Sequence, residues 1–419
     1  MTFPSTHPSD FCWAAGIENT FIPQSRFGMR ALDEYALTQH YQQWKTDLDL
    51  VAETGVRALR WGIPWYKVQP APNRWDWAWV DQVLDYMVNG KGIAPILDLM
   101  HYGTPLWLEN SFVNHQYPER VAEYASAVVE RYASLVRYIT PLNEPTVNAD
   151  FCGRRGEWPP YLEGDDGYVK LCLAIAKGMV LTSQAIRAAN PQLVQVQVEA
   201  LWKFTTQSAQ HAEQVALQNE HQYLVFDLTT GRVNPQHPLY SYLQGFGASE
   251  ALLDWFQHNK ASYDVFGANF YPWSYGEYVP RADGALRRVR RKTSGWAIAE
   301  VVEDAYRRYQ LPVMVTETSA TEKMAGRAQW MDETIAAVFD LRKKGVPVVG
   351  YTWFPMITMI DWAYRRGRKP VSDYLLNLGL FEASFDANGL LKRSPTEYVA
   401  RYRSYTTQTV PPVGPQLNK

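Results

Sequence analysis

The chain has 419 residues, which is enough for one large domain with elaborated loops. Its formal net charge is −2, and charged residues make up 20% of the sequence without long runs of one sign. This near-neutral balance gives no electrostatic reason to expect a nucleic acid or an anionic membrane surface as partner.

The chain contains three cysteines, Cys12, Cys152 and Cys172, and their spacing fits no metal motif. We therefore expect free thiols in a reducing compartment and no bound metal ion. The first residues lack the basic and apolar stretches of a signal peptide, and the apolar runs are too short to span a membrane. These observations predict a soluble cytoplasmic protein.

Eight short apolar runs alternate with longer segments whose apolar residues recur at helical spacing. Near-continuous apolar runs are typical of parallel strands that are buried on both faces. In chain order, the predicted strands are Phe11–Ile17, Val56–Ile63, Ile93–Met100, Arg137–Asn143, Leu193–Ala200, Tyr263–Phe270, Pro312–Glu317 and Val348–Phe354. The predicted helices between them are Tyr41–Thr54, Val80–Asn89, Pro118–Val136, Gly178–Ala189 and Gly326–Lys344.

Eight strands that alternate with helices favour a (β/α)8 barrel, the TIM barrel, over an open doubly wound sheet. No G-x-G-x-x-G motif follows the first strand, which argues against a dinucleotide-binding half. The sequence shows no linker and no repeat of fixed period. We therefore expect residues 1–419 to form a single barrel domain with a loose C-terminal tail that begins near Thr406.

Two glutamates stand out among the polar residues that close the predicted strands. Glu144 follows the fourth strand and Glu317 ends the seventh, and the C-terminal strand ends of such a barrel form its active site. There, the two carboxyl groups can flank one bond of a bound sugar. A retaining glycosidase needs its carboxyl groups about 5–5.5 Å apart, so that one protonates the leaving oxygen and the other attacks the anomeric carbon.

The neighbouring strand ends supply groups that suit these roles. We expect Arg60 to keep Glu317 ionised by ion pairing and Tyr271 to donate a hydrogen bond to it. We expect Asn143 to hydrogen-bond the 2-hydroxyl of the sugar and His101 to donate to a neighbouring hydroxyl. Taken singly, such residues are more often surface charges or structural partners. The presence of one polar group at nearly every strand end is what indicates a sugar site.

Thr140-Pro-Leu-Asn143-Glu144-Pro145 resembles the Thr-x-Asn-Glu-Pro signature of glycoside hydrolase family 1, the β-glucosidase family, with one extra residue after the threonine. Other segments resemble motifs of this family in the same order along nearly the whole chain. They are Phe11-Cys-Trp13, Arg60-Trp-Gly-Ile63-Pro-Trp65, His101-Tyr-Gly-Thr-Pro105, Asn269-Phe-Tyr271, Thr316-Glu317-Thr318, Asn377-Leu-Gly379-Leu380-Phe381 and Arg393-Ser-Pro395-Thr396.

The resemblance implies a retaining β-glycosidase on a barrel with glutamates on strands four and seven. It assigns Glu144 as the acid/base and Glu317 as the nucleophile. It also implies that Trp353 is the platform on which the sugar ring stacks. The aromatic content of 14% agrees with a sugar-binding pocket, because aromatic faces suit the C–H faces of sugar rings.

The chain departs from the family pattern where the family grips its sugar. In place of the family's Gln-Ile-Glu-Gly it has Ile17-Glu18-Asn19, so Glu18 either substitutes for the glutamine or the contact is lost. The family's late Trp-Ser-Leu-x-Asp-Asn-Phe-Glu-Trp becomes a segment of altered spacing that ends in Asp361-Trp362. These positions contact the O4 and O6 side of the sugar in the family, so the resemblance implies the chemistry but leaves the identity of the sugar open.

Alternatives remain beside the hydrolysis of β-linked glucosides or related sugars. A transglycosylase would use the same two glutamates with a sugar or alcohol in place of water. A non-catalytic sugar-binding barrel would usually have lost one glutamate, and other barrel enzymes need a Schiff-base lysine or a His/Asp metal cluster that the strand ends lack. We expect no cofactor, a small carbohydrate or glycoside as the bound molecule, and leave the oligomeric state open.

Overall fold

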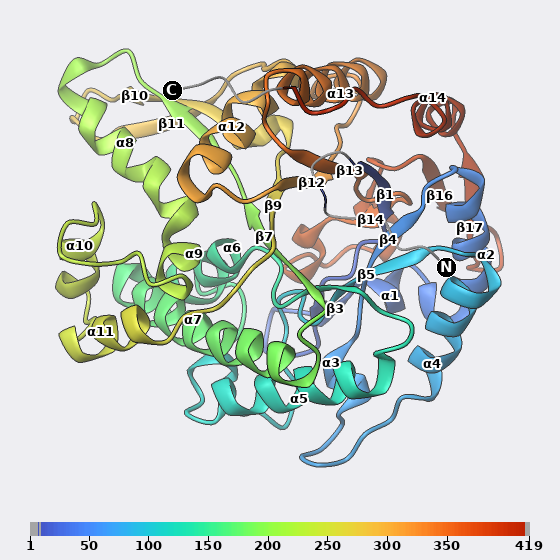
Figure 1. Ribbon diagram of the computed structural model, residues 1–419, viewed down its shortest axis with the longest axis horizontal. Coiled ribbons are helices and arrows are strands. Elements are labelled where there is room, and N and C mark those ends of the chain that lie inside the picture. Colours follow the sequence, from blue (N-terminus) through green and yellow to red (C-terminus); the bar gives the residue numbers. More distant parts are fainter. Residues whose placement is uncertain (1–6, 8–9, 415–419) are drawn as a thin grey trace.

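The computed structural model describes residues 7 and 10–414, and a closed barrel of eight strands forms its centre (Figure 1). The strands are β1 (Cys12–Gly16), β4 (Ala58–Gly62), β5 (Ala94–Asp98), β6 (Tyr138–Thr140), β7 (Val194–Ala200), β9 (Val265–Asn269), β12 (Val313–Thr318) and β13 (Val348–Trp353). Neighbours pair in parallel in this order, and β13 closes the ring against β1. Each strand overlaps one predicted run, and the predicted barrel is confirmed.

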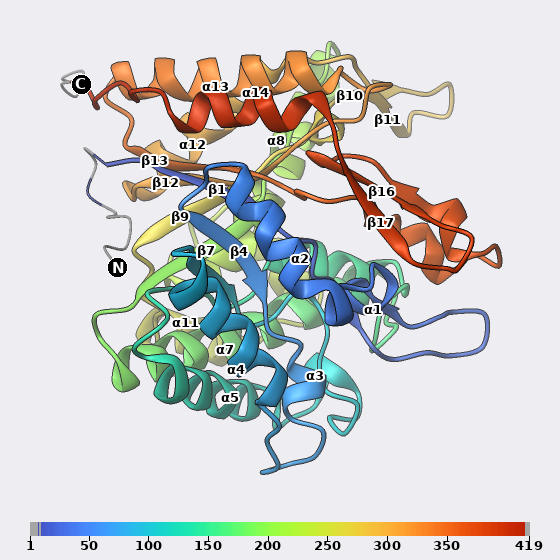
Figure 2. The same ribbon diagram turned by 90° about the vertical axis from the view of Figure 1, so that its right-hand side faces the viewer.

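Helices surround the barrel, as Figures 1 and 2 show from two sides. The longer ones are α2 (His40–Glu53), α4 (Ala78–Asp85), α5 (Tyr117–Tyr132), α7 (Gly164–Ala189), α8 (Ala212–Glu220), α11 (Glu250–His258), α12 (Ile298–Tyr309), α13 (Arg327–Lys343) and α14 (Glu397–Thr406). The shorter ones are α1 (Glu34–Leu37), α3 (Trp65–Val68), α6 (Pro145–Ala149), α9 (Leu224–Thr229) and α10 (Tyr240–Gly245). All five predicted helices exist, but α7 begins at Gly164 rather than at Gly178.

Helix α7 requires a correction, because we expected no segment that is long and apolar enough to span a membrane. By length and composition alone, Gly164–Ala189 meets that criterion. However, 67% of its most apolar window is buried inside the fold, and it packs along α5 and α9. The helix is therefore apolar because it is a core helix covered on several sides, which is the ordinary reason for such a composition.

Two layers of side chains fill the barrel interior, and they differ in polarity along its axis. The lower layer is apolar and consists of Cys12, Ala14, Ala58, Ala94, Ile96, Tyr138, Val194, Val196, Val198, Val265, Met314 and Val349. Nearer the C-terminal strand ends, the buried residues include Arg60, Asp98 and Asn269. Because strand side chains alternate in direction, the same strands that build the apolar layer also place these polar groups above it.

Small two- and three-stranded sheets extend from the C-terminal end of the barrel, on the right of Figure 2. One joins β8 (Lys203–Thr205) to the hairpin of β10 (Tyr275–Pro280) and β11 (Leu286–Arg290). The others pair β2 (Phe21–Ile22) with β3 (Leu32–Asp33), β14 (Met359–Ile360) with β15 (Leu375–Leu376), and β16 (Phe381–Phe385) with β17 (Leu391–Pro395). These additions surround the end of the barrel at which the polar layer lies.

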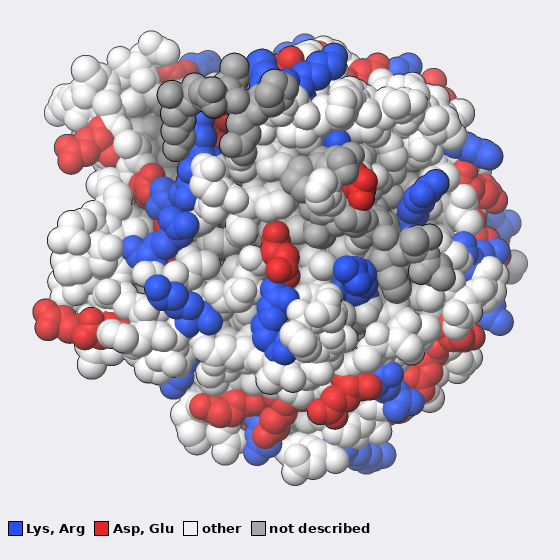
Figure 3. Space-filling view, in the orientation of Figure 1, with Lys and Arg blue, Asp and Glu red and all other residues white. Residues whose placement is uncertain are grey.

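The opposite end of the barrel faces the viewer in Figures 1 and 3. Lysine and arginine alternate there with aspartate and glutamate, so this face presents no large area of one charge (Figure 3). The expected loose tail ends beyond the described residues, at 415–419. Its described part contacts Arg342, which donates to the Pro411 carbonyl at 2.7 Å and accepts from the Gly414 amide at 2.8 Å.

Candidate active site

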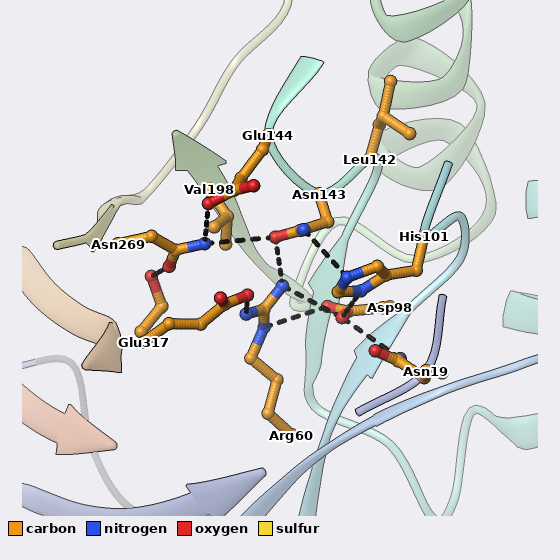
Figure 4. Close-up of polar contacts among 12 residues, drawn as sticks. Asn19, Arg60, Asp98, His101, Leu142, Asn143, Glu144, Val198, Asn269 and Glu317 are labelled. Atoms are coloured by element: carbon orange, nitrogen blue, oxygen red, sulfur yellow. Dashed lines mark hydrogen bonds and ion pairs between the residues drawn. The ribbon is translucent and has the colours of Figure 1, made fainter. Parts of the chain in front are cut away.

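Arg60 is at the centre of the polar layer and is wholly buried (Figure 4). Its guanidinium group binds Asp98 at 2.9 Å, donates to the Asn143 side-chain oxygen at 2.7 Å and forms an ion pair with Glu317. Burial disfavours its charge, but the two carboxylates outweigh this effect and raise the pKa of Arg60. One cation therefore ties together side chains from strands β4, β5 and β12 and from the segment after β6.

Asp98 is the second charged partner of Arg60 and lies at the end of β5. Burial alone would raise its pKa, but Arg60 and His101 lower the pKa of Asp98 overall. His101 Nδ1 lies 3.2 Å from Asp98, and Asn19 donates to the same carboxylate at 3.3 Å. This carboxylate was not among the predicted site residues, although it ends a predicted strand three residues before His101.

Glu317 reaches the site because β12 contains a bulge. Val315 pairs with Ala268 and Glu317 with Asn269, so β12 has one more residue than its neighbour at this point. As a result, two successive side chains contact site residues: Thr316 donates to Asn269 at 2.7 Å, and Glu317 binds Arg60. Tyr271 donates to the second oxygen of Glu317 at 2.7 Å. Both predicted partners of Glu317 are thus in contact with it.

Glu144 lies between β6 and the short helix α6, with a backbone φ of 42° in the left-handed region. Its amide donates to the Val198 carbonyl at 3.1 Å, which fixes the turn against β7. Asn269 donates to one carboxyl oxygen at 2.8 Å, and the Tyr102 hydroxyl donates to the other. Burial, together with repulsion from Glu317, nevertheless raises the pKa of Glu144 to about 7.

Asn143 and His101 are joined to each other beside these glutamates. The Asn143 amide nitrogen lies 3.0 Å from His101 Nε2 and donates to the Tyr102 hydroxyl at 2.8 Å. Its oxygen accepts from Arg60 and, at 3.3 Å, from Asn269. The side-chain polar atoms of Asn143 and His101 are therefore bonded within the protein, which keeps both side chains in place.

Glu18 lies in the same cluster, with 6% of its side chain exposed. One of its oxygens accepts from the Thr20 amide at 3.0 Å and from the Thr20 hydroxyl at 2.6 Å, and lies 3.8 Å from His101 Nε2. Burial raises the pKa of Glu18, and repulsion from Glu317 adds to this effect. The departure from the family's glutamine therefore places a carboxyl group within the site.

The structure corrects the prediction that Trp353 is a sugar-stacking platform. Trp353 is wholly buried on the outer side of β13, where its indole N–H donates to the Leu378 carbonyl at 3.1 Å and its ring meets Tyr402. Because successive side chains of a strand point to opposite faces, the next residue points into the site. The ring of Phe354 stacks with His101 at 6.3 Å and lies 5.5 Å from the Arg60 guanidinium.

Asp361 and Trp362 have different environments. Asp361 is exposed and caps the helical turn Trp362–Arg365 by accepting from the Ala363 amide at 2.8 Å, so the structure does not place it among the site side chains. Trp362 packs against Tyr102 at 5.4 Å and so borders the acid/base end of the site. The buried carboxyl group near this segment belongs instead to Glu34, which accepts from the Ile360 amide at 3.0 Å.

Several site residues were missed by the sequence analysis: Asn19, Glu34, Asp98, Tyr102, Asn269 and Phe354. Asn269 and Tyr102 lie within motifs that had been noted for their neighbours Tyr271 and His101. A rule that examined every polar residue of those motifs would have found them. Among the described residues, no group of three or more His, Cys, Asp and Glu side chains is arranged to hold a metal ion.

Comparisons with known proteins identify the family of the chain. The sequence model of glycosyl hydrolase family 1 matches residues 18–230, about half of the chain. Beta-glucosidase 47 of Arabidopsis thaliana is 22% identical over 88% of this chain and 76% of its own length. Beta-glucosidase A of Thermotoga maritima is 23% identical over 77% of this chain and 79% of its own.

Solved structures show the same fold. The beta-glucosidase from Thermotoga maritima in complex with deoxynojirimycin superposes with a TM-score of 0.80 at 18% identity, covering 96% of this chain and 98% of that one. The same enzyme in complex with castanospermine gives a TM-score of 0.81. The chain belongs to glycosyl hydrolase family 1, which confirms both the resemblance of its motifs and the predicted class of enzyme, a retaining β-glycosidase.

Proposed function

We propose that the protein hydrolyses β-glucosides or closely related β-glycosides, with Glu144 as the acid/base and Glu317 as the nucleophile. The observation that carries these roles is the difference between their partners. Glu317 is bonded to a cation, Arg60, whereas Glu144 is bonded only to the neutral donors Tyr102 and Asn269. A nucleophile must be ionised, and a general acid must hold a proton near neutral pH, as a pKa of about 7 permits for Glu144.

In the first step, Glu144 transfers its proton to the glycosidic oxygen as the bond from that oxygen to the anomeric carbon breaks. A carboxylate oxygen of Glu317 forms a new bond to the anomeric carbon from the opposite face. The product is a glycosyl ester of Glu317 together with the released alcohol. Arg60 and Tyr271 bind the two oxygens of Glu317, so they orient the carboxylate for attack.

In the second step, Glu144 is a carboxylate and takes a proton from water as the water oxygen attacks the anomeric carbon. The ester bond to Glu317 breaks and the sugar leaves with its original anomeric configuration. Hydrogen bonds from Tyr102 and Asn269 stabilise the charge that Glu144 carries in this step. An alcohol in place of water would give transglycosylation by the same route.

The sugar ring is proposed to lie between Phe354 and the polar cluster of Glu18, His101 and Asn143. Relatives in Arabidopsis thaliana and Thermotoga maritima are named beta-glucosidases, which supports a glucose-like ring. Glu18 carries a carboxyl group where the family has an amide, and the raised pKa of Glu18 favours the protonated acid, which can both donate and accept as the amide does.

We also propose a cytoplasmic location, which cell fractionation would test.

The test is the hydrolysis of 4-nitrophenyl β-glycosides of glucose, galactose, fucose, mannose, xylose and glucuronic acid, with Glu317→Ala as the comparison. We expect one or two gluco-configured substrates to be hydrolysed, and the variant to lose about four orders of magnitude or more in kcat. Azide should partly restore activity in the variant. It enters from the face that Glu317 occupied and should therefore give the α-glycosyl azide.

The outcomes separate the parts of the proposal. A β-glycosyl azide from the Glu317→Ala variant would exchange the two roles. An unchanged kcat in this variant would exclude Glu317 as the nucleophile. If the folded wild type hydrolyses none of the substrates, the proposal that it hydrolyses simple glycosides is wrong. The hypothesis of a non-catalytic sugar-binding barrel then gains support.

A further inference from the structure

The β10–β11 hairpin and the residues that follow it are strongly basic. Six basic residues lie within residues 281–292: Arg281, Arg287, Arg288, Arg290, Arg291 and Lys292. Figure 2 shows the hairpin projecting from the end of the barrel at which the active site lies. The chain as a whole has a net charge of −2, so this concentration of positive charge is local.

The hairpin has two faces, and one of them combines arginine with aromatic side chains. Tyr278 pairs with Arg288 and Gly276 with Arg290, so both arginines share the face of Tyr278. The Arg288 guanidinium lies 4.4 Å from the centre of the Phe204 ring, and the Phe204 and Tyr278 rings lie 5.4 Å apart. We call these four residues, Phe204, Tyr278, Arg288 and Arg290, the rim face. Arg287 points to the opposite side of the hairpin.

A short series of contacts connects the rim face to the nucleophile. Arg288 donates to the main-chain carbonyl of Trp273. The Trp273 ring stacks on the Tyr271 ring at 4.4 Å and 8°. Tyr271 donates to Glu317. Three contacts therefore separate the rim face from Glu317.

The positive charge on the rim face has no acidic partner. Arg291 pairs with Glu277 at 2.7 Å and Arg281 with Asp283 at 3.6 Å. In the part of the chain that the structure describes, no carboxylate pairs with Arg288 or Arg290. Partial burial, with repulsion from Arg290 and Arg155, lowers the pKa of Arg288. Uncompensated like charges beside an active-site entrance favour a ligand of the opposite charge.

We propose that the rim face is the binding site for the leaving group of the substrate and takes an aromatic aglycone that carries an anionic substituent. The partly exposed ring of Tyr278 offers an aromatic contact to an aryl group, the buried Phe204 ring supports Tyr278 and Arg288 from below, and Arg288 and Arg290 bind a carboxylate, sulfate or phosphate on the aryl group. We assign the leaving group to this face because Arg288 and Arg290 are exposed, whereas Glu18, His101 and Asn143, which are proposed to face the sugar, are buried. The assignment of the bound aryl group as the leaving group rests on the proposed function.

The experiment compares 4-carboxyphenyl β-glucoside with its methyl ester, which has the same ring and no charge. Calorimetry on the full chain with Glu317→Ala, which leaves the probes intact, gives the dissociation constant of each, and kcat/KM is measured beside it on the chain that retains Glu317. We expect the carboxylate to bind about tenfold more tightly at low salt, and the preference to fall when salt is added. Arg288→Gln and Arg290→Gln should each reduce the preference by about threefold or more.

Arg287→Gln is the matched control, because it removes the same charge from the other face of the same strand. It should leave the preference unchanged. Arg290→Gln guards against disruption of the hairpin, since its side chain has no hydrogen bond in the described structure, unlike that of Arg288. A wild type that does not prefer the carboxylate, or a preference that both rim variants retain, would overturn the inference.

Failure of the proposed function is visible separately. If neither 4-nitrophenyl glucoside nor the two probes are hydrolysed, the hydrolase assignment is at fault, while the ratio of dissociation constants still decides the inference. If the neutral substrates are hydrolysed and the ratio is close to one, only the inference fails. Sulfate and phosphate analogues of the probe then show which anionic group binds best.

Discussion

The surroundings of Glu317 and Glu144 differ although both side chains are almost equally buried, with 4% and 7% exposed. Glu317 contacts a wholly buried arginine, and Glu144 contacts a tyrosine hydroxyl and an amide. Similar burial therefore goes with different partners. A single cation at Arg60 contacts one glutamate of the site, while the other has neutral donors and a raised pKa.

The same comparison explains why Arg60 is placed where it is. It contacts Glu317 and Asp98 but is bonded to neither oxygen of Glu144. If Arg60 contacted both glutamates, both would be held ionised and no general acid would be present at neutral pH. Asn143 and Asn269 lie between Arg60 and Glu144 and connect them through neutral groups.

The largest effect is expected from Arg60→Met, which removes the charge that separates the two glutamates. Asp98 and Glu317 would remain buried without a cation, which costs about 3–5 kcal/mol of stability. We also expect kcat/KM to fall by about a thousandfold, since Glu317 loses its orienting partner. Chemical denaturation and steady-state kinetics check both effects. Arg342→Met, which removes a buried arginine at the other end of the barrel, should lower stability without this loss of kcat/KM.

A smaller effect on stability is expected from Glu144→Gln. The pKa of Glu144 is about 7 in the folded protein, above the ordinary value of 4.5. The folded protein binds the Glu144 proton more tightly than the unfolded chain does. The free energy of unfolding is therefore largest below about pH 4.5 and falls as pH rises through about 7. The neutral glutamine avoids the loss, so the variant should be more stable than the wild type by roughly 1–3 kcal/mol at pH 8. Urea unfolding at pH 4.5 and pH 8 measures this; an equal difference at both values would contradict it.

The smallest effect is expected from Tyr102→Phe, which removes one neutral donor from Glu144. The hydrogen bond from Tyr102 favours the ionised carboxyl and so lowers the pKa of Glu144 against burial and Glu317. Without it, the pKa should rise, and the basic limb of the kcat/KM profile should move upward by roughly half to one pH unit.

A matched variant separates this change in the pKa of Glu144 from any general effect of removing a buried hydroxyl. Tyr117→Phe removes another buried hydroxyl nearby, one that lies 3.8 Å from the Met100 sulfur and contacts no glutamate. Its pH profile should coincide with that of the wild type. A shift of the Tyr102→Phe profile toward lower pH would show that the tyrosine stabilises the protonated acid instead.

The sequence was sufficient to place the barrel strands because each one is a short apolar run buried on both faces. The residues at which helices begin were harder to predict. Helix α7 begins at Gly164 because its first turns are buried against the rest of the chain, and periodicity within the segment cannot reveal that cover. Helices α12 and α14 were missed although α12 has a strongly amphipathic pattern, Val301, Val302 and Ala305 being buried on one face.

Within the site, residues at strand ends were predictable and the directions of neighbouring side chains were not. Arg60, Glu317 and Tyr271 meet as expected because each closes a strand of the same barrel. The exchange of Trp353 for Phe354 came from a one-residue error in strand register, which reverses the face that a side chain occupies. Tyr102 has a φ of 79°, so its direction depends on a backbone turn that residue type does not indicate.

The extra residue in β12 makes the reaction depend on the length of the chain at one point. Glu317 faces its partners because Thr316 occupies a position without a counterpart in β9. Deleting that single residue would leave every catalytic side chain in the sequence while moving the carboxylate to the level that Thr316 now occupies, below Arg60 and Tyr271. Chain length at this strand is thus as necessary to the nucleophile as its chemistry.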